Sequence, residues 1–319
     1  GSQAFLSSPM VGQPLNLCGK VSKKSFMALA ASSPSRVAIL IIDPQNDFHG
    51  GGSLAVTGAD EDALRIAQMI KYNQDDIADI YITLDCHHKM HIAHKGFWRN
   101  ENGEMPAPMT QITHAEVKAG KWRVAQPEHA NWALEYTEKL EAGGRFTLII
   151  WPEHCLIGTS GNIVVNCIND AAQEWALSKS TSVNYVQKGM NCLAEMYSVF
   201  KAEVPVPGAP ETGLNTALIK QLHDGNYDKI VICGQAASHC VNYSTRDLVD
   251  NWKQDMSKLV LMEDGMSPVV VPAVGLDFTE AKDQFQNEMK EKGLLMSKCG
   301  EVMKPFPPPE LKKKSYASS

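Results

Sequence analysis

Short apolar runs alternate with segments of helical periodicity along most of this chain. Residues 37–43 (VAILIID) form a continuous apolar run that ends in a charged residue, which is typical of a strand buried on both faces. Similar runs predict five further strands, at 79–85, 146–151, 183–187, 229–233 and 258–262. Helical spacing of apolar residues predicts helices at 60–72, 163–177, 215–222, 241–251 and 279–292.

This alternation indicates the α/β class. Parallel strands need crossover connections, and a helix between successive strands supplies a right-handed one. We therefore expect a three-layer αβα fold, with a doubly wound sheet of about six mainly parallel strands and helices on both faces.

The composition divides the chain into three parts. Residues 1–36 contain eight serines and no Asp or Glu, a composition typical of an organelle transit segment or of a flexible extension. Residues 37–300 carry the alternating pattern and are interpreted as one domain. Residues 301–319 are rich in proline and lysine and are expected to extend over the surface.

Net charge and cysteine content limit the binding partners and the cellular compartment that we expect. The net charge of −6 gives no reason to expect a nucleic-acid partner or an anionic membrane surface. No apolar run approaches the roughly 20 residues that span a bilayer. The eight cysteines form no CxxC pair, so free thiols in an intracellular, reducing compartment are expected, with plastid or mitochondrion as the options raised by the N-terminal composition.

The chemically capable residues follow the ends of the predicted strands. In parallel sheets, ligands bind beyond the carboxyl ends of the strands. These positions hold Asp43, Asp85, His87, His154, Lys188 and Cys240. The sequence therefore predicts that they gather at one edge of the sheet.

Cys240 is the candidate nucleophile. It lies where a helix should begin, and the helix dipole there favours the thiolate. Asp43 could accept the thiol proton, and Lys188 could lower the pKa of the thiol. The alternatives are a cysteine that only packs, an aspartate that caps a turn and a lysine on the surface.

Asp85, His87 and His154 are the candidate metal ligands. Residues two apart on an extended chain point the same way, so Asp85 and His87 can present an oxygen and a nitrogen to one point. Two imidazoles and a carboxylate suit Zn²⁺ above all, with Fe²⁺ or Mn²⁺ as options. The alternative is a pair of loop histidines bonded to the backbone.

Several nearby residues receive other interpretations. The histidines at 88, 91 and 94 are left out of the ligand set. His239 is interpreted as structural or at the rim of the pocket, because it points away from its neighbour Cys240. Cys86 and Cys155 are interpreted as packing residues.

Five motifs carry a resemblance to a known family: residues 43–48 (DPQNDF) with 51–56 (GGSLAV), Asp85-Cys-His87, residues 151–159 (WPEHCLIGT), Lys188-Gly189 with Tyr197-Ser198-Val-Phe200, and residues 234–241 (GQAASHCV). In this order the chain resembles the isochorismatase-like cysteine hydrolases, and nicotinamidases in particular, over roughly residues 37–270. It departs from compact members at Cys86, where tryptophan is usual, and in an apparent insertion at 96–145.

The resemblance implies a mechanism and a set of site residues. Cys240 would attack an amide carbonyl, most directly that of nicotinamide, and form a thioester. The backbone N–H groups of Ala236 and Cys240 would form the oxyanion hole, beside a cis peptide at Gln235–Ala236. A divalent metal would orient the substrate, and Phe48 and Trp98 are expected to form walls against a flat ring.

Other functions stay open on the sequence alone. The same residues could act on another small amide, a ureide or a carbamoyl compound. Vinyl ether hydrolysis of the isochorismatase type would not need Cys240, and a binding protein would need none of the catalytic residues. A homo-oligomer is expected, because relatives often pair.

Overall fold

A computed structural model describes residues 35–307 of the chain except 144–146. The predictions for residues 1–34 and 308–319 lie outside the described residues. The central sheet has six strands, all parallel, in the order β12-β9-β8-β1-β2-β7. Their bounds are β1 Val37–Ile42, β2 Ile77–Asp85, β7 Asn184–Lys188, β8 Lys229–Gly234, β9 Leu259–Met262 and β12 Leu295–Ser297.

Strand β1 lies at the centre of the sheet because it is apolar throughout. All six of its residues are buried, and it pairs with β2 on one side and β8 on the other. Its alternate side chains enter two separate apolar clusters, Ile39 and Ile41 on one face and Leu40 and Ile42 on the other. A strand buried on both faces is what a continuous apolar run predicts.

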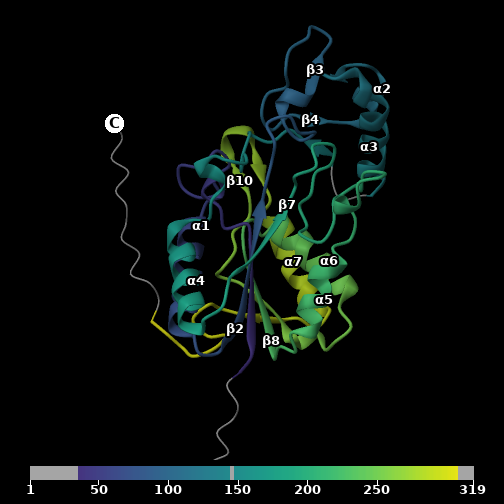
Figure 1. Ribbon diagram of the computed structural model, residues 1–319. Coiled ribbons are helices and arrows are strands. Elements are labelled where there is room, and N and C mark those ends of the chain that lie inside the picture. Colours follow the sequence, from purple (N-terminus) through teal and green to yellow (C-terminus); the bar gives the residue numbers. More distant parts are fainter. Residues whose placement is uncertain (1–34, 144–146, 308–319) are drawn as a thin grey trace, which may run out of the picture. The chain divides into compact units, whose positions relative to one another are not determined.

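Helices cover both faces of the sheet, as Figure 1 shows. Helices α1 (Ala59–Tyr72) and α4 (Asn166–Lys179) share one apolar cluster, which includes Ile66 and Trp175. On the opposite face lie α5 (Thr216–Asp224), α6 (Cys240–Asn251) and α7 (Thr279–Glu291). The predicted three-layer αβα fold is confirmed.

One predicted strand of the sheet was wrong. The run at 146–151 yields only β6 (Leu148–Ile149), which pairs antiparallel with β4 (Gln111–Ile112) outside the central sheet. An apolar run predicts that a segment is buried, but it does not specify which strand the segment will pair with. The sixth strand of the sheet is instead β12, a three-residue segment that was not predicted.

The region predicted as an insertion, 96–145, contains small elements of its own beyond the carboxyl edge of the sheet (Figure 1). They are β3 (Trp98–Asn100), β4, α2 (His114–Lys118), β5 (Trp122–Val124) and α3 (Ala130–Ala142). Strands β3 and β5 pair antiparallel. Trp98 and Tyr136 are fully buried here and join the apolar cluster of the α5–α7 face.

The remaining strands, β10 (Val270–Val271) and β11 (Leu276–Asp277), form a short hairpin before α7. Among the described residues, no helix combines the length and apolar character that crossing a bilayer demands.

Candidate active site

Four candidate residues from distant parts of the chain meet at the carboxyl edge of the sheet. Asp43 follows β1 directly, Asp85 ends β2, Lys188 ends β7 and Cys240 begins α6. All four are buried. The sheet register brings Asp85 and Lys188 side by side, because they are paired residues of neighbouring strands.

Lys188 is the centre of this group. Its Nζ lies 2.9 Å from Asp85 Oδ1, 3.0 Å from Asp43 Oδ2 and 3.7 Å from Cys240 Sγ. Burial opposes the charge, but the two carboxylates outweigh it and raise the pKa of Lys188 well above its usual value. The lysine therefore remains an ammonium ion inside the protein.

Asp43 is held in an unusual backbone conformation beside Thr83. Its φ is 43°, in the left-handed region that a residue with a side chain seldom adopts. Its N–H donates to Thr83 Oγ1 at 2.9 Å, and the Thr83 hydroxyl donates to Asp43 Oδ1 at 2.5 Å. Burial raises the pKa of Asp43 above its ordinary value, against the pull of Lys188. A carboxylate with a raised pKa is a better proton acceptor toward a thiol.

The position of Cys240 at the start of α6 favours the thiolate, and its burial acts against it. Burial raises the pKa of its thiol well above the ordinary value, although Lys188 acts in the opposite direction. The carboxylates of Asp43 and Asp85 also disfavour a second negative charge nearby. The helix dipole and the ammonium group do not overcome these effects, so the resting thiol keeps its proton until a base removes it.

The three predicted metal ligands also converge. Asp85 Oδ2 lies 3.0 Å from His87 Nε2 and 3.3 Å from His154 Nε2. His154 Nδ1 lies 2.8 Å from the Pro152 carbonyl, which can only accept, so Nδ1 carries the ring proton of a neutral His154. The lone pair on Nε2 then faces a carboxylate oxygen. Such a pair repels unless a cation or a proton lies between the two atoms.

His94 is a candidate ligand that sequence reasoning missed. Ligand atoms of His87, His94 and His154 lie within 4.8 Å of one another, and all three residues are buried. Neither ring nitrogen of His94 has a hydrogen-bond partner of good geometry in the described part of the chain. Burial lowers the pKa of His94 to about 3, so its ring is neutral and can offer a lone pair. The loop between His87 and His94 has no regular spacing that would have revealed this approach.

His91 lies equally close but differs in its bonding. Its ring centroid is 4.4 Å from that of His87. Its Nε2 lies 3.2 Å from the Ala194 carbonyl, and its Nδ1 accepts from the Ala93 N–H at 3.2 Å. Both ring nitrogens of His91 therefore have hydrogen-bond partners, although its ligand atoms also lie within 4.8 Å of those of His87 and Glu195 and could join a metal site there.

A small cavity opens beside these groups, with a free volume of about 30 Å³. A cavity of that volume admits water. The lining residues are Phe48, Leu54, Asp85, Trp151, His154, Glu195, Tyr197, Ala236, His239, Cys240 and Val269.

Phe48 lines the cavity as expected for a wall residue, whereas the prediction for Trp98 was wrong. The Trp98 side chain is fully buried in the core, where its indole N–H donates to the Ile92 carbonyl at 2.7 Å. The aromatic wall is instead formed by Trp151 and Tyr197, linked by a hydrogen bond of 2.9 Å from the Trp151 indole N–H to the tyrosine oxygen. His239 packs against both rings.

Glu195 is a second residue that the sequence analysis missed. It is buried and lines the cavity. Its Oε1 accepts from the Met196 N–H at 2.9 Å, whereas Oε2 has no hydrogen-bond partner among the described residues. A buried carboxylate oxygen without a partner is costly, which indicates that a ligand donor or a cation completes it, and Glu195 does lie in a possible metal-ligand group with His87 and His91. No predicted motif includes this position.

The turn before α6 has the conformation implied by the resemblance. The Gln235–Ala236 peptide is cis, and Gly234 before it has a φ of 114°. A Cβ at Gly234 would lie 2.1 Å from the Ile42 carbonyl oxygen, so only glycine fits against β1 here.

Gln45 fixes the ends of two strands relative to each other. Its side-chain amide donates to the Asp85 carbonyl at 2.7 Å and accepts from the Asp85 N–H at 2.7 Å. Asp47 Oδ2 accepts from the Cys155 N–H at 2.6 Å. Part of the 43–48 motif therefore positions the metal-binding residues instead of reacting. Cys86 and Cys155 are fully buried.

A larger cavity of about 360 Å³ lies between β7 and the segment at 189–217. Lys188 and Met196 border it, but none of the candidate metal ligands does, nor does Cys240. The smaller cavity is therefore the candidate active site.

Comparison with known proteins agrees with this geometry. No protein-family model matches the chain. A nicotinamidase of Acinetobacter baylyi is 24% identical over 238 residues, which cover 75% of this chain and 85% of that protein. A nicotinamidase/pyrazinamidase of Mycobacterium tuberculosis is 25% identical over 214 residues, covering 67% of this chain and 79% of that protein.

Solved structures share the fold. A nicotinamidase/pyrazinamidase of Acinetobacter baumanii superposes with a TM-score of 0.56 at 19% identity, covering 85% of this chain and all of that one. The yeast nicotinamidase bound to the inhibitor nicotinaldehyde gives a TM-score of 0.55 at 20% identity, covering 82% of this chain and 99% of that one. The sequence relatives support the resemblance of this chain to the isochorismatase-like hydrolases, nicotinamidases in particular, and the solved structures show that the fold is shared.

Proposed function

We propose that this chain is an amidohydrolase that cleaves the C–N bond of a small amide, with nicotinamide and water giving nicotinate and ammonia as the leading reaction. Its nicotinamidase relatives support the reaction class. The observation that carries the proposal is the position of Lys188 Nζ, 3.0 Å from Asp43 and 3.7 Å from the Cys240 sulfur in a buried site.

The first half of the reaction acylates Cys240. Asp43 accepts the thiol proton as the sulfur attacks the carbonyl carbon, and Lys188 balances the negative charge that develops on sulfur. The N–H groups of Ala236 and Cys240 stabilise the oxyanion. Asp43 then gives its proton to the departing amine, which leaves as ammonia and a thioester remains.

The second half releases the acid. Asp43, again a carboxylate, accepts a proton from water as the water oxygen attacks the thioester carbon. Collapse of the tetrahedral intermediate breaks the C–S bond. The sulfur recovers the proton from Asp43, and the site returns to its resting state.

The histidine cluster fits a divalent metal, since it brings three buried imidazoles together beside the carboxylate of Asp85. Asp85, His87, His94 and His154 would hold the ion, with Zn²⁺ as the leading candidate. When bound, the metal supplies a Lewis acid that orients a substrate beside Cys240.

A different small amide is the second candidate. Glu195 places an unpartnered carboxylate oxygen on the cavity wall, and such an oxygen accepts N–H donors. Nicotinamide offers only the two N–H donors of the amide that is cleaved, whereas a ureide or carbamoyl compound carries further N–H donors outside the scissile group. This observation favours testing those classes beside nicotinamide.

Ammonia release tests the proposal directly. The purified chain is incubated with nicotinamide and with a panel of small amides and ureides, with Cys240→Ala as the control. Release that the substitution abolishes supports the thiol mechanism, and undiminished release contradicts it. Release from ureides alone would transfer the proposal to the second substrate class, and no release from any compound would refute it. The expected homo-oligomer is tested separately by light scattering.

A further inference from the structure

The segment at 189–200 forms part of the active-site wall without a helix or strand of its own. It carries Glu195 and Tyr197, which line the cavity, and Met196, which contacts Lys188. A segment without regular structure depends on bonds from its neighbours for its position.

Two of these bonds come from one helix of the 96–145 region. On α3, the Trp132 indole N–H donates to the Leu193 carbonyl at 2.7 Å. One turn later, the Tyr136 hydroxyl oxygen accepts from the Glu195 N–H at 3.1 Å. Tyr136 is fully buried, and its ring lies 5.8 Å from that of Trp132. The helix thus holds the segment on both sides of Ala194.

A short chain of bonds continues from Tyr136 to the catalytic lysine. The Glu195 side chain accepts from the Met196 N–H at 2.9 Å, and the Met196 carbonyl accepts from Lys188 Nζ at 2.8 Å. An ammonium group has three N–H donors. Those of Lys188 are matched by Asp85 Oδ1, the Met196 carbonyl and the Cys240 sulfur, and Asp43 Oδ2 lies 3.0 Å away in an ion pair.

We propose that Tyr136 is a positioning residue for the reaction proposed above. By fixing the Glu195–Met196 backbone, it keeps the Met196 carbonyl where it directs Lys188 toward Cys240. Tyr136 does not line the cavity and does not touch Lys188. Its effect therefore acts on the lysine and the thiol, and substrate binding is left largely unchanged.

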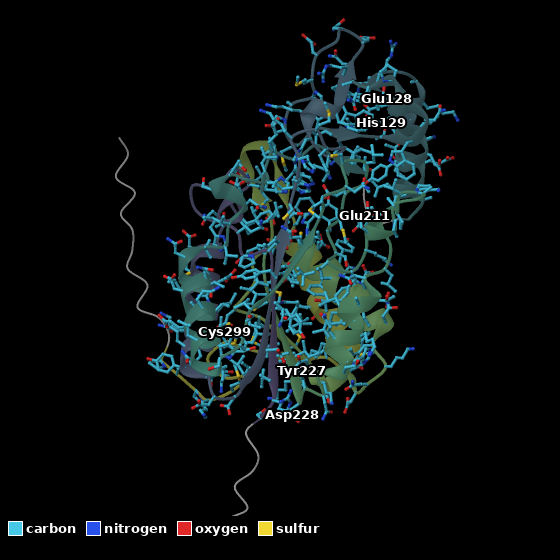
Figure 2. All side chains as sticks on the ribbon, viewed as in Figure 1. Glu128, His129, Glu211, Tyr227, Asp228 and Cys299 are labelled. Atoms are coloured by element: carbon cyan, nitrogen blue, oxygen red, sulfur yellow. The ribbon has the colours of Figure 1, made fainter. Side chains whose placement is uncertain are left out.

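Tyr136→Phe tests this, because it removes only the hydroxyl oxygen. The matched control is Tyr227→Phe, which also removes a buried hydroxyl with hydrogen bonds, to Asp79 at 2.7 Å and Tyr81 at 3.1 Å. Tyr227 precedes β8, at the end of the sheet away from the 96–145 region, as its label beside Asp228 and those of Glu128 and His129 show in Figure 2.

The readouts are kcat, KM, thermal stability and the rate at which iodoacetamide alkylates Cys240, followed on the Cys240 peptide by mass spectrometry. In Tyr136→Phe we expect kcat and the alkylation rate to fall about three- to tenfold, the range that loss of one hydrogen bond allows, with KM changed less than about twofold. In Tyr227→Phe, kcat and the alkylation rate should equal those of the wild type. Trp132→Phe should lower the same two rates in the same sense.

Equal alkylation rates and equal kcat in Tyr136→Phe and Tyr227→Phe would overturn the proposal. So would a rise in KM alone, because that would place Tyr136 in substrate binding. The alkylation rate does not depend on any amide being hydrolysed. If the wild type hydrolyses none, the proposed function fails, and the ratio of alkylation rates alone decides the role of Tyr136.

Discussion

The two halves of the candidate active site differ in how far their polar atoms are satisfied. In the catalytic half (Asp43, Lys188 and Cys240), Lys188 forms ion pairs with Asp43 and Asp85 at 3.0 Å or less, although Asp43 Oδ2 has no hydrogen bond of good geometry among the described residues. In the histidine half, His87 Nδ1 and both nitrogens of His94 have no partner of good geometry in the described residues. Both halves are equally buried.

This difference indicates which half is neutralised by side chains of the chain itself and which half requires an added cation. Buried polar atoms are nearly always paired, so a buried group of unpaired imidazoles is a strained arrangement unless a cation completes it. In the catalytic half the chain itself supplies the counter-ion, Lys188. We therefore expect the catalytic half to respond to substitution of its own residues, and the histidine half to respond to metal supply.

The largest expected effect follows from loss of the sulfur. Cys240→Ala should lower kcat at least about 10³-fold, because no other group can form the thioester. Its metal content should be unchanged, since the sulfur is not among the ligands. Cys167→Ala, a half-buried cysteine on α4, is the control and should keep full activity. Loss of metal in Cys240→Ala would contradict the division into halves.

Lys188→Ala should affect both activity and stability. It leaves two carboxylates buried without their counter-charge, which costs about 3–5 kcal/mol of unfolding free energy. Urea denaturation measures this loss. Lys220→Ala, whose exposed partner Asp224 stays in water, should change stability by less than about 1 kcal/mol. Equal losses in the two variants would show that the buried pairing contributes nothing.

His94 distinguishes the ligand set predicted from the sequence from the larger set proposed from the structure. His94→Ala should reduce metal affinity about 10- to 100-fold and lower activity with it. Metal content per chain is measured by mass spectrometry after dialysis, and excess metal should partly restore activity. The exposed neighbour His88 gives the control, and His88→Ala should bind as the wild type does. Unchanged affinity in His94→Ala would restore the smaller set of Asp85, His87 and His154.

The smallest effect is a pH dependence outside both halves. Burial lowers the pKa of His239 from 6.5 to about 3, so the folded state excludes a proton that the unfolded chain accepts. The free energy of unfolding is therefore not reduced by His239 above about pH 6.5. As the pH falls from there toward 3, the free energy of unfolding decreases by about 1 kcal/mol per pH unit. Urea denaturation between pH 6.5 and 4.5 should therefore show a shallower slope in His239→Gln than in the wild type. An identical slope would mean that other groups cause the acid sensitivity.

The sequence predicted the parts of the fold that rest on local pattern. The apolar run of β1 and the helical spacing of α1 predicted these elements correctly, because burial determines the residue types at their positions. The run at 146–151 shows the limit, since its apolar residues were buried but against β4. Nothing in a single strand specifies its partner, and the three residues of β12 are too few to give a pattern.

In the candidate site, too, residues that follow a local sequence pattern were predicted, and residues placed only by tertiary packing were not. Asp43, Lys188 and Cys240 were found because strand ends of a parallel sheet meet at one edge. His94, Glu195 and Tyr136 were missed because they lie in loops or in the 96–145 region, where tertiary packing alone decides which side chains meet. The effect of burial on the Cys240 thiol could not be predicted for a related reason, because helix position is visible in a sequence and depth of burial is not.

The central claim is that the Cys240 sulfur bonds to the substrate. Rapid acid quench during turnover of nicotinamide, followed by mass spectrometry of the Cys240 peptide, tests it most directly. The account predicts that this peptide gains the mass of a nicotinoyl group, transiently and in the wild type only. Steady ammonia release that leaves the Cys240 peptide unmodified at every quench time, and that persists in Cys240→Ala, would contradict it.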